Sequence, residues 1–394
     1  MKLTALATHS PSEAVRAALA ARGWDADHSR FAASGLQPLI LMLDDITEDE
    51  REALVRWSLR AGADVLTGDG WALVAAAASR LAPLARPDRA PPGLESLVPE
   101  LARFFIAYAE PPRCWAIAGG EIALNEPVLI GILNVTPDSF SDGGRFTGTD
   151  AAVAHAEQLK ADGCQLLDIG GESTRPGAAP VSVDEEKSRV LPVVDALIAR
   201  GLGPLSVDTR KAEVARVALG AGASVINDVS GLTFDAELGS VVARNGAGLI
   251  LMHMRGTPGT MDGLARYDHV AAEVAGELEA AAGRATGSGV ERERIVVDPG
   301  FGFAKSAEQS FRLLDELATI VRLGYPVLVG PSRKRFLGAA TGRPAEDRDR
   351  ATAVACALAW ERGARLFRVH EVGLVREALA VARATTGDGG GGGA

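Results

Sequence analysis

The stretch PVLIGILNVTPDSFSDGG, residues 127–144, joins an apolar run to a long polar loop. The run ends at Asn134, and only Val135 and Phe140 are large apolar side chains among the ten residues that follow it. A continuous apolar run of this length is typical of a strand that is buried on both faces, as strands of parallel sheets usually are. The stretch therefore predicts a buried strand that carries an amide side chain into a polar loop.

Seven more apolar runs of this kind follow along the chain, and helical patterns separate most of them. Strand and helix alternating eight times predict an α/β fold, the (β/α)8 TIM barrel. An open doubly wound sheet is the alternative, but no glycine fingerprint follows the first run. The eight runs end 20 to 46 residues apart, at Asn134, Gly170, Asp208, Asp228, Met252, Asp298, Gly330 and Val369.

The chain has 394 residues, which is more than one average domain needs. Before the barrel we expect a small α/β domain of unknown role, with two helices that begin at capping boxes, Ser10 to Glu13 and Thr47 to Glu50. Its expected strands are KLTALATH (2–9), LQPLILML (36–43) and ADVLTG (63–68). The expected segments are this domain (1–84), a Pro-rich linker with a lead-in helix (85–112), the barrel (113–386) and a disordered glycine tail (387–394). Within the barrel segment, RCWAIAGGEIAL (113–124) predicts a hairpin that closes the barrel bottom.

Composition narrows the class of protein. The net charge of −10 and the lack of a basic face argue against a nucleic-acid partner. No apolar run is long enough to span a bilayer, and the N-terminus turns polar too soon for a signal peptide, so we expect no membrane partner. Three widely spaced cysteines without a CxxC motif indicate a reducing compartment, and we expect a cytoplasmic protein.

Polar side chains gather at the predicted strand ends, where barrel enzymes build their sites. Three acceptors, Asp208, Asn227 and Asp298, suit the flat donor edge of a nitrogen-rich heterocycle. Asn134 can donate to an anion or ligate a hard cation through its oxygen. The cationic candidates, which suit a phosphate, are Arg175, Lys334, Arg368 and His370. The pattern predicts a pocket for a small heterocycle that carries a phosphate or diphosphate.

Motifs of several hydrolytic and nucleotide chemistries are missing from the sequence. It contains no GxSxG elbow, no HExxH and no GxxxxGK[ST] loop. Without an evident nucleophile, we expect displacement of a leaving group in a site that holds two reactants and stabilises charge.

Eight motifs in order over about residues 125–385 resemble the dihydropteroate synthases of folate biosynthesis. They are GILNVTPDSFSDGG, DIGGESTRPGA, SVDT, INDVSG, LMHMRGTP, VVDPGFGFAK, SRKRFLG and RVHEV. The resemblance implies a transferase that joins 6-hydroxymethyl-7,8-dihydropterin diphosphate to p-aminobenzoate and releases diphosphate. It also implies Mg²⁺ as cofactor and a homodimer.

The resemblance implies a role for each matching residue. The residues implied to hold the pterin are Asp208, Asn227, Asp298 and Lys334, with Met252 beneath its ring and Thr174 in contact with the same substrate. The diphosphate would be bound by Arg368 and His370, and its Mg²⁺ by Asn134. The p-aminobenzoate slot would be bordered by Phe303, Ser332, Lys334 and Arg335. Asp138 and Arg175 belong to two mobile loops, and they complete the implied catalytic set with Asp208, Lys334, Arg368 and His370.

The sequence also departs from the family pattern. Arg335 stands where many members carry serine, which bears on p-aminobenzoate contacts and on sulfonamide affinity, and Glu371 stands where Asp is common. About 110 residues precede the compact barrel typical of the family. Two alternative functions are a methyltetrahydrofolate–corrinoid methyltransferase and a non-catalytic pterin-binding barrel. The loop residues Asp138, Thr174 and Arg175 favour an active enzyme over the latter.

Overall fold

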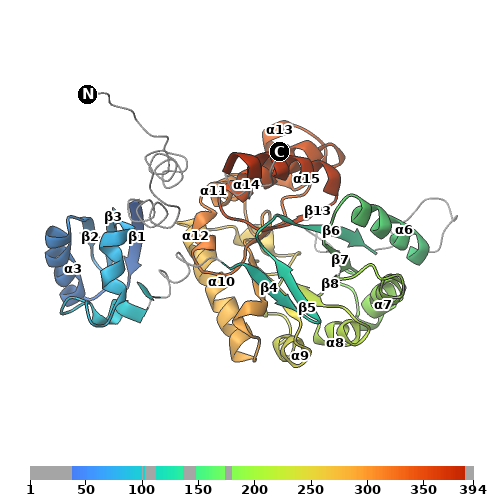
Figure 1. Cartoon of the computed structure of the whole chain (residues 1–394), viewed down its shortest axis with the longest axis horizontal. Coiled ribbons are helices and arrows are strands. Elements are labelled where there is room, and N and C mark those ends of the chain that lie inside the picture. Colours follow the sequence, from blue (N-terminus) through green and yellow to red (C-terminus); the bar gives the residue numbers. More distant parts are fainter. Residues whose placement is uncertain (1–37, 100, 103–111, 136–147, 174–179, 387–394) are drawn as a thin grey trace, which may run out of the picture. The chain divides into compact units, whose positions relative to one another are not determined.

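The computed structural model describes residues 38–99, 101–102, 112–135, 148–173 and 180–386 (Figure 1). Contacts divide the chain into two compact units, Met1–Glu110 and Pro111–Ala394. Several predictions lie outside the described residues: the strand at 2–9 and the helix cap at Ser10, most of the lead-in helix, the glycine tail, and the site candidates Asp138, Thr174 and Arg175.

The described part of the first unit contains a three-stranded antiparallel sheet in the order β1-β3-β2 and the 14-residue helix α3. Its elements are β1 (Pro38–Asp44), α3 (Glu48–Ala61), β2 (Asp64–Gly68) and β3 (Trp71–Ala77). The predicted capping box opens α3, because Glu50 N donates to the Thr47 hydroxyl (3.2 Å) and Thr47 N donates to the Glu50 carboxylate (2.7 Å). β3 was not predicted, because its alanines have low strand propensity. Pairing on both of its edges holds it in the sheet.

The Pro-rich stretch predicted as a linker contributes to the core of the first unit. The short elements α4 (Ala78–Leu81) and η1 (Ala82–Ala85) lead into this stretch, and η2 (Glu95–Leu97) lies within it. Leu84 and Leu94 are both buried against Leu54 and Val74. Apolar side chains at the two ends of the stretch therefore anchor it to the unit that precedes it.

The second unit opens with the predicted hairpin, β4 (Cys114–Ile117) and β5 (Gly120–Ala123). Gly119 turns the chain with φ +81°, a conformation that glycine adopts readily. Trp115 is fully buried, and its ring nitrogen donates to the carbonyl of Arg294 (2.8 Å). The hairpin packs on the inward side chains at the amino ends of the barrel strands, so the prediction that it closes the barrel bottom is confirmed.

Eight parallel strands form the barrel, in agreement with the predicted fold. Their order around the sheet is β11-β10-β9-β8-β7-β6-β13-β12. A parallel bridge between Val297 and Val327, with Val297 N donating to the carbonyl of Pro326 (3.0 Å), joins the two ends of the sheet. The strands are β6 (Val128–Asn134), β7 (Leu166–Gly170), β8 (Leu205–Asp208), β9 (Val225–Asp228), β10 (Gly248–Met252), β11 (Ile295–Asp298), β12 (Leu328–Val329) and β13 (Leu366–Val369).

Helices cover the outside of the strands (Figure 1). They are α6 (Gly148–Ala161), α7 (Val183–Ala199), α8 (Ala212–Gly220), α9 (Leu238–Arg244), α10 (Val270–Gly287), α11 (Ala307–Asp315), α12 (Ala318–Val321), α13 (Arg335–Thr341), α14 (Asp349–Glu361) and α15 (Val372–Thr386). Short 3-10 turns η4 (Met261–Leu264), η5 (Arg292–Arg294) and η6 (Ala345–Asp347) lie between them. None of the helices in the described ranges combines the length and apolar character needed to cross a bilayer.

Successive side chains of each barrel strand point alternately inward and outward, and this alternation places the site residues. Outward residues such as Leu167 and Val207 pack against the helices. Inward residues at the barrel base, such as Leu166 and Ile250, pack against the hairpin. Two residues further along, the same face of each strand reaches the opposite mouth. The mouth positions reached in this way are Asp168, Asn227, Met252, Asp298, Gly330 and Arg368.

Candidate active site

Arg368 is the centre of a buried charge cluster at the barrel mouth. Its Nε donates to Asp168 Oδ2 (2.6 Å) and its Nη2 donates to Asp208 Oδ2 (3.1 Å). Asn227 Nδ2 also donates to Asp168 Oδ2 (3.0 Å). Strands two, three, four and eight of the barrel are thereby joined through side chains, and one guanidinium faces two buried carboxylates.

Asp168 lies in β7 and was not among the predicted site residues. It is completely buried, and its Oδ1 has no hydrogen-bond partner among the described residues. The available signal was a carboxylate inside the apolar run LLDIG, on the face that also carries Gly170 to the mouth. A buried charge of this kind is destabilising unless it is paired, so Asp168 is part of the Arg368 arrangement.

The pKa values of the two acidic candidates move in one direction for one reason. Burial raises the pKa of Asp208, which Arg368 lowers in part and Asp168 raises further. Burial likewise raises the pKa of Asp298 to about 6, against the opposing effects of Gly300 N–H, Lys334 and Arg368. Both carboxylates therefore release their protons in a range closer to neutral than ordinary aspartates do.

Asp298 ends β11 and faces the same pocket from the other side. Its Oδ1 accepts from Gly300 N (2.7 Å). Its Oδ2 lies 3.8 Å from where a Cβ on Gly330 would stand, and Arg368 Cβ lies 3.9 Å from that point. The missing side chain at the end of β12 thus leaves room between the carboxylate and the arginine.

Lys334, Phe303 and Met252 come together beside Asp298. The Lys334 ammonium lies over the Phe303 ring, 3.9 Å from its centroid. Phe303 and Met252 are buried in one small cluster with Val229 and Met261. The arrangement offers an apolar surface next to a cation and a carboxylate, which suits a flat, polar-edged ring.

Ser332 and His370 form a second pair at the mouth. The Ser332 hydroxyl accepts from His370 N (3.2 Å) and lies 2.9 Å from His370 Nδ1. A serine hydroxyl can accept twice, or accept once and donate once, so Ser332 contacts Nδ1 whichever ring nitrogen of His370 carries the hydrogen. The two contacts fix the orientation of the His370 ring at the barrel mouth.

Arg333 and Arg335, on either side of Lys334, form ion pairs with residues that are not among the predicted site residues. Arg335 is exposed and pairs with Asp262 (2.8 Å), so its guanidinium is held by η4. Arg333 has a left-handed backbone (φ +57°) and pairs with Asp349 at the start of α14 (2.7 Å). Of the consecutive cations 333 to 335, the structure brings Lys334 alone against another predicted site residue.

Asn134, at the end of β6, has the position that an oxygen ligand needs. It pairs in register with Gly170, and a Cβ on that glycine would lie 3.5 Å from Asn134 Oδ1 and 3.8 Å from Asp208 Cβ. The absent side chain leaves the amide oxygen open to the space next to the acidic cluster. A single amide oxygen fits Mg²⁺, which usually keeps several waters and takes its remaining ligands from substrate phosphates.

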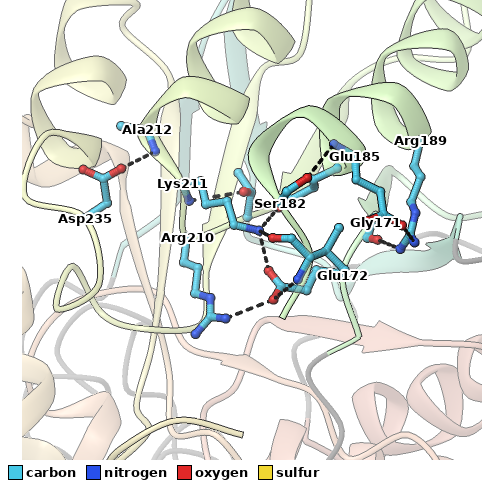
Figure 2. Close-up of polar contacts among 12 residues, drawn as sticks. Gly171, Glu172, Ser182, Glu185, Arg189, Arg210, Lys211, Ala212 and Asp235 are labelled. Carbon is cyan, nitrogen blue, oxygen red and sulfur yellow. Dashed lines mark hydrogen bonds and ion pairs between the residues drawn. The ribbon is translucent and has the colours of Figure 1, made fainter. Parts of the chain in front are cut away.

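A second buried ion network holds the residues on either side of segment 174–179, which itself lies outside the described residues (Figure 2). Lys211 Nζ donates to Glu172 Oε2 (2.8 Å), to the carbonyl of Val181 (2.7 Å) and to Glu186. Arg210 donates to Glu172 Oε1 (3.0 Å). One ammonium thus joins the chain before the segment to the chain after it. This network was not predicted, although TRK directly follows strand three.

The sequence matches the family profile described as "Pterin binding enzyme" over residues 130–370, more than half of the chain. The chain belongs to the pterin-binding enzyme family. The matched region begins within β6 and ends directly after β13, so it contains the whole barrel mouth. The resemblance inferred from the motifs is therefore confirmed.

Relatives of this chain include dihydropteroate synthases. The enzyme of Synechocystis sp. is 46% identical over 257 residues, which are 65% of this chain and 89% of that protein. The Xanthomonas albilineans dihydropteroate synthase with 4-aminobenzoic acid is 46% identical with a TM-score of 0.66, covering 70% of this chain and 99% of that one. The same enzyme in complex with 7,8-dihydropteroate gives 43% identity and a TM-score of 0.64, covering 69% and 98%.

Proposed function

We infer that this chain is a dihydropteroate synthase, a transferase that condenses 6-hydroxymethyl-7,8-dihydropterin diphosphate with p-aminobenzoate to give 7,8-dihydropteroate and diphosphate. The single observation that carries the inference is the buried Arg368 cluster at the barrel mouth, within a chain 46% identical to a synthase over 89% of that protein's length. Related structures contain 4-aminobenzoic acid and 7,8-dihydropteroate, which are a substrate and the product of this reaction.

The acceptor groups account for binding of the pterin. Asn227 Nδ2 donates to Asp168 Oδ2, which fixes the orientation of the amide, and its oxygen is proposed to accept from the N–H edge of the heterocycle. Asp208 and Asp298 supply two further acceptors from opposite sides of the mouth. In this proposal Met252 lies beneath the ring, Lys334 borders it next to Phe303, and Thr174 also contacts it.

The cations account for binding of the diphosphate. Ser332 fixes the orientation of the His370 ring, whose Nε2 is proposed to donate to a diphosphate oxygen. Arg368 contributes a guanidinium whose orientation is fixed by Asp168 and Asp208, and these two contacts use only two of its five N–H groups. Arg175 and Asp138 are proposed to complete the site from their loops.

We propose Mg²⁺ as the cofactor, held on the protein side by Asn134 Oδ1. When bound there, the ion would neutralise charge on the diphosphate oxygens. The open space beside Gly170 supports this assignment.

The proposed reaction is a displacement with a dissociative character. The bond between the pterin methylene carbon and the diphosphate oxygen breaks, and Arg368 and His370 stabilise the departing anion. The methylene carbon becomes cationic, and Asp208 stabilises it electrostatically. The amine of p-aminobenzoate then forms the new C–N bond and loses a proton, for which its low basicity demands no strong base.

The methyltransferase alternative has no use for a diphosphate site, and the relatives described above are synthases. A direct test incubates the purified chain with the pterin diphosphate and p-aminobenzoate and measures diphosphate release. Release is expected to require both p-aminobenzoate and Mg²⁺. Lack of diphosphate release with all components present would refute the proposed function.

Asp208→Asn tests the electrostatic role proposed for this carboxylate. We expect kcat to fall by about 10²- to 10³-fold, as when one charge-stabilising group is removed, with a much smaller change in diphosphate affinity. Steady-state kinetics and calorimetry with diphosphate would measure the two effects. Equal losses in turnover and diphosphate affinity would contradict the role.

Other parts of the proposal concern the chain as a whole. We propose that residues 113–386 are the catalytic domain, that 1–84 and 85–112 are an additional domain and its connection, and that 387–394 are a disordered tail. We propose a homodimer, as expected for the family, to be tested by sedimentation. A cytoplasmic location is supported by the three cysteines, all of which are free.

A further inference from the structure

Lys305, the last residue of the motif DPGFGFAK, is buried behind the barrel mouth with 5% of its surface exposed. Its Nζ lies 2.8 Å from His253 Nδ1, 3.0 Å from the carbonyl of Phe303 and 3.2 Å from the carbonyl of Gly300. The ammonium therefore touches the end of β10 and two points of the loop that follows β11.

The contacts of His253 show which hydrogens are available. Its Nε2 lies 2.9 Å from Glu277 Oε2, and a carboxylate can only accept, so Nε2 carries the hydrogen and Nδ1 is an acceptor. Burial lowers the pKa of His253 to about 4, which agrees with a neutral ring. All three hydrogens of a charged Lys305 then have an acceptor, and the lysine is fully satisfied in its buried position.

The loop held by Lys305 has an unfavourable backbone. Gly300 and Gly302 have φ values of +66° and +75°, and Ala304 has φ +49° although it is not glycine. A left-handed alanine persists only where its surroundings hold it there. The carbonyls of Gly300 and Phe303 also need donors in this buried place, and Lys305 supplies them.

Both points of attachment lead directly to groups of the candidate site. Phe303 carries the ring over which Lys334 lies (3.9 Å to the centroid). Gly300 N–H donates to Asp298 Oδ1 (2.7 Å). A movement of the loop would therefore displace a wall of the p-aminobenzoate slot and turn the Asp298 carboxylate at the same time.

We propose that Lys305 is a positioning residue for the synthase reaction, which holds Phe303 and Asp298 in place through the loop 299–304 and is itself held by the His253–Glu277 pair. This inference rests on the proposed function and extends it to residues that need no contact with either substrate. His253 directly follows β10, so the pair ties the loop after β11 to the end of the neighbouring strand and to α10.

The charge of Lys305 also affects the pKa of Asp298. Asp298 and Glu277 face this ammonium and raise its pKa, whereas burial, Arg255 and Lys334 lower it, to about 7 in all. In return, the charge of Lys305 lowers the pKa of Asp298. A neutral side chain at 305 is expected to raise the pKa of Asp298, and so to move the acid limb of the pH–rate profile upward.

The test replaces Lys305 with an apolar side chain of similar length. For Lys305→Met we expect the KM for p-aminobenzoate to rise roughly ten- to hundredfold, because displaced groups lose their productive geometry. We also expect the acid limb of kcat/KM for the pterin diphosphate to move to higher pH, because the pKa of Asp298 loses the lowering effect of the Lys305 charge. Glu277→Gln should produce the same changes to a smaller extent, since Glu277 acts through His253.

Lys160→Met is the matched control. Lys160 is partly buried and also donates to two backbone carbonyls, of Gln165 (2.9 Å) and Gly203 (3.1 Å), but these lie at the amino ends of the strands. We expect this variant to lower the melting temperature without a specific change in the KM for p-aminobenzoate or in the pH profile.

The possible outcomes separate this inference from the proposed function. A wild-type chain that releases no diphosphate would refute the proposed function. If the wild type is active but Lys305→Met changes only stability, as Lys160→Met does, the positioning role is wrong. If Lys305→Met does not fold, Glu277→Gln is the deciding variant. The Glu277 side chain is 42% exposed, and its replacement leaves Lys305 in place. An unchanged KM and pH profile in Glu277→Gln would then overturn the inference.

Discussion

At the scale of single residues, Arg368 is the one guanidinium among the described residues that pairs with both Asp168 and Asp208. Two buried carboxylates next to one guanidinium leave a net negative centre, which burial disfavours and which explains the raised pKa of Asp208. A cationic reaction centre would be stabilised at this place. The same residues that make the pocket suitable for the reaction therefore reduce its contribution to folding stability.

Gly300 is expected to tolerate no side chain. Its φ is +66°, and a Cβ there would stand 2.1 Å from the carbonyl oxygen of His253. Gly300→Ala should lower the free energy of unfolding by at least about 2 kcal/mol, since backbone strain and a steric clash add. It should also impair turnover by turning Asp298. Urea denaturation and steady-state kinetics measure both effects.

Gly302→Ala is the matched control for that experiment. Gly302 has a similar φ of +75°, but the nearest atom to its Cβ would be Lys334 Cδ at 3.7 Å, an ordinary contact. The expected loss of stability is that of the strained backbone alone, about 1 kcal/mol. If both variants lose the same stability, the predicted clash at residue 300 does not exist.

Asp298 gives a pH dependence whose sign differs for activity and stability. Its pKa is raised from 3.8 to about 6, so the acceptor is lost below about pH 6 and kcat/KM for the pterin should fall on that side by about tenfold per pH unit. Its contribution to stability is fully present below 3.8 and is lost as the pH rises through about 6.

Asp298→Asn separates those two effects. We expect the variant to lose its acid limb together with most of its activity, and to resist urea at pH 8 at least as well as the wild type. Stability that falls at pH 8 in this variant would show that the charged carboxylate stabilises the fold, contrary to the direction of its pKa.

At the scale of secondary structure elements, each barrel strand contributes side chains both to the base of the barrel and to its mouth. Ile250 and Val296 pack at the base, and Met252 and Asp298 follow two residues later at the mouth. The hairpin β4–β5 covers only the base. Stability and chemistry are thereby assigned to opposite ends of the same strands, as is general in TIM barrels.

Trp115→Ala should affect stability without affecting chemistry. The fully buried indole would leave a cavity at the barrel base and a carbonyl at Arg294 without its donor, so we expect a loss of about 3–5 kcal/mol. Turnover at a temperature where the variant is folded should be unchanged. Trp71→Ala, at a tryptophan that is 38% exposed in the first unit, should change stability far less. A large fall in kcat for folded Trp115→Ala would contradict the separation of base and mouth.

At the scale of the whole molecule, the family match and the compact second unit coincide. The profile covers residues 130–370, within the unit Pro111–Ala394. The first unit has its own buried core, which includes Leu54, Val74 and Leu84. The two units therefore have the anatomy of separate domains.

Deletion of residues 1–110 tests whether the barrel acts alone. We expect the shortened chain to release diphosphate with a kcat/KM within about twofold of the full chain, because domains with separate cores usually fold and function independently. The comparison uses the same assay on both proteins. Loss of folding or of turnover in the shortened chain would assign the first unit a role in the reaction.

Much of the fold and part of the site could be predicted from the sequence because their signals are local. Continuous apolar runs such as VLIGIL identify a buried strand without any knowledge of its neighbours, and the hairpin about Gly119 could be identified in the same way. The polar residues at the ends of the runs had to meet at one mouth, since parallel strands of a barrel all end there. β3 was missed because its alanines favour a strand only once partners pair with it on both sides.

The sequence alone determined the barrel, its closing hairpin and the positions of Asp208, Asn227, Asp298 and Arg368 at the strand ends. Only the tertiary structure decided which of these groups touch. Asp168 joins Arg368 to Asn227, Arg335 is held by Asp262, and Lys305 is held by His253. These contacts link residues that are tens to hundreds of positions apart in the chain. Such pairings depend on side-chain direction and burial, which no local pattern encodes.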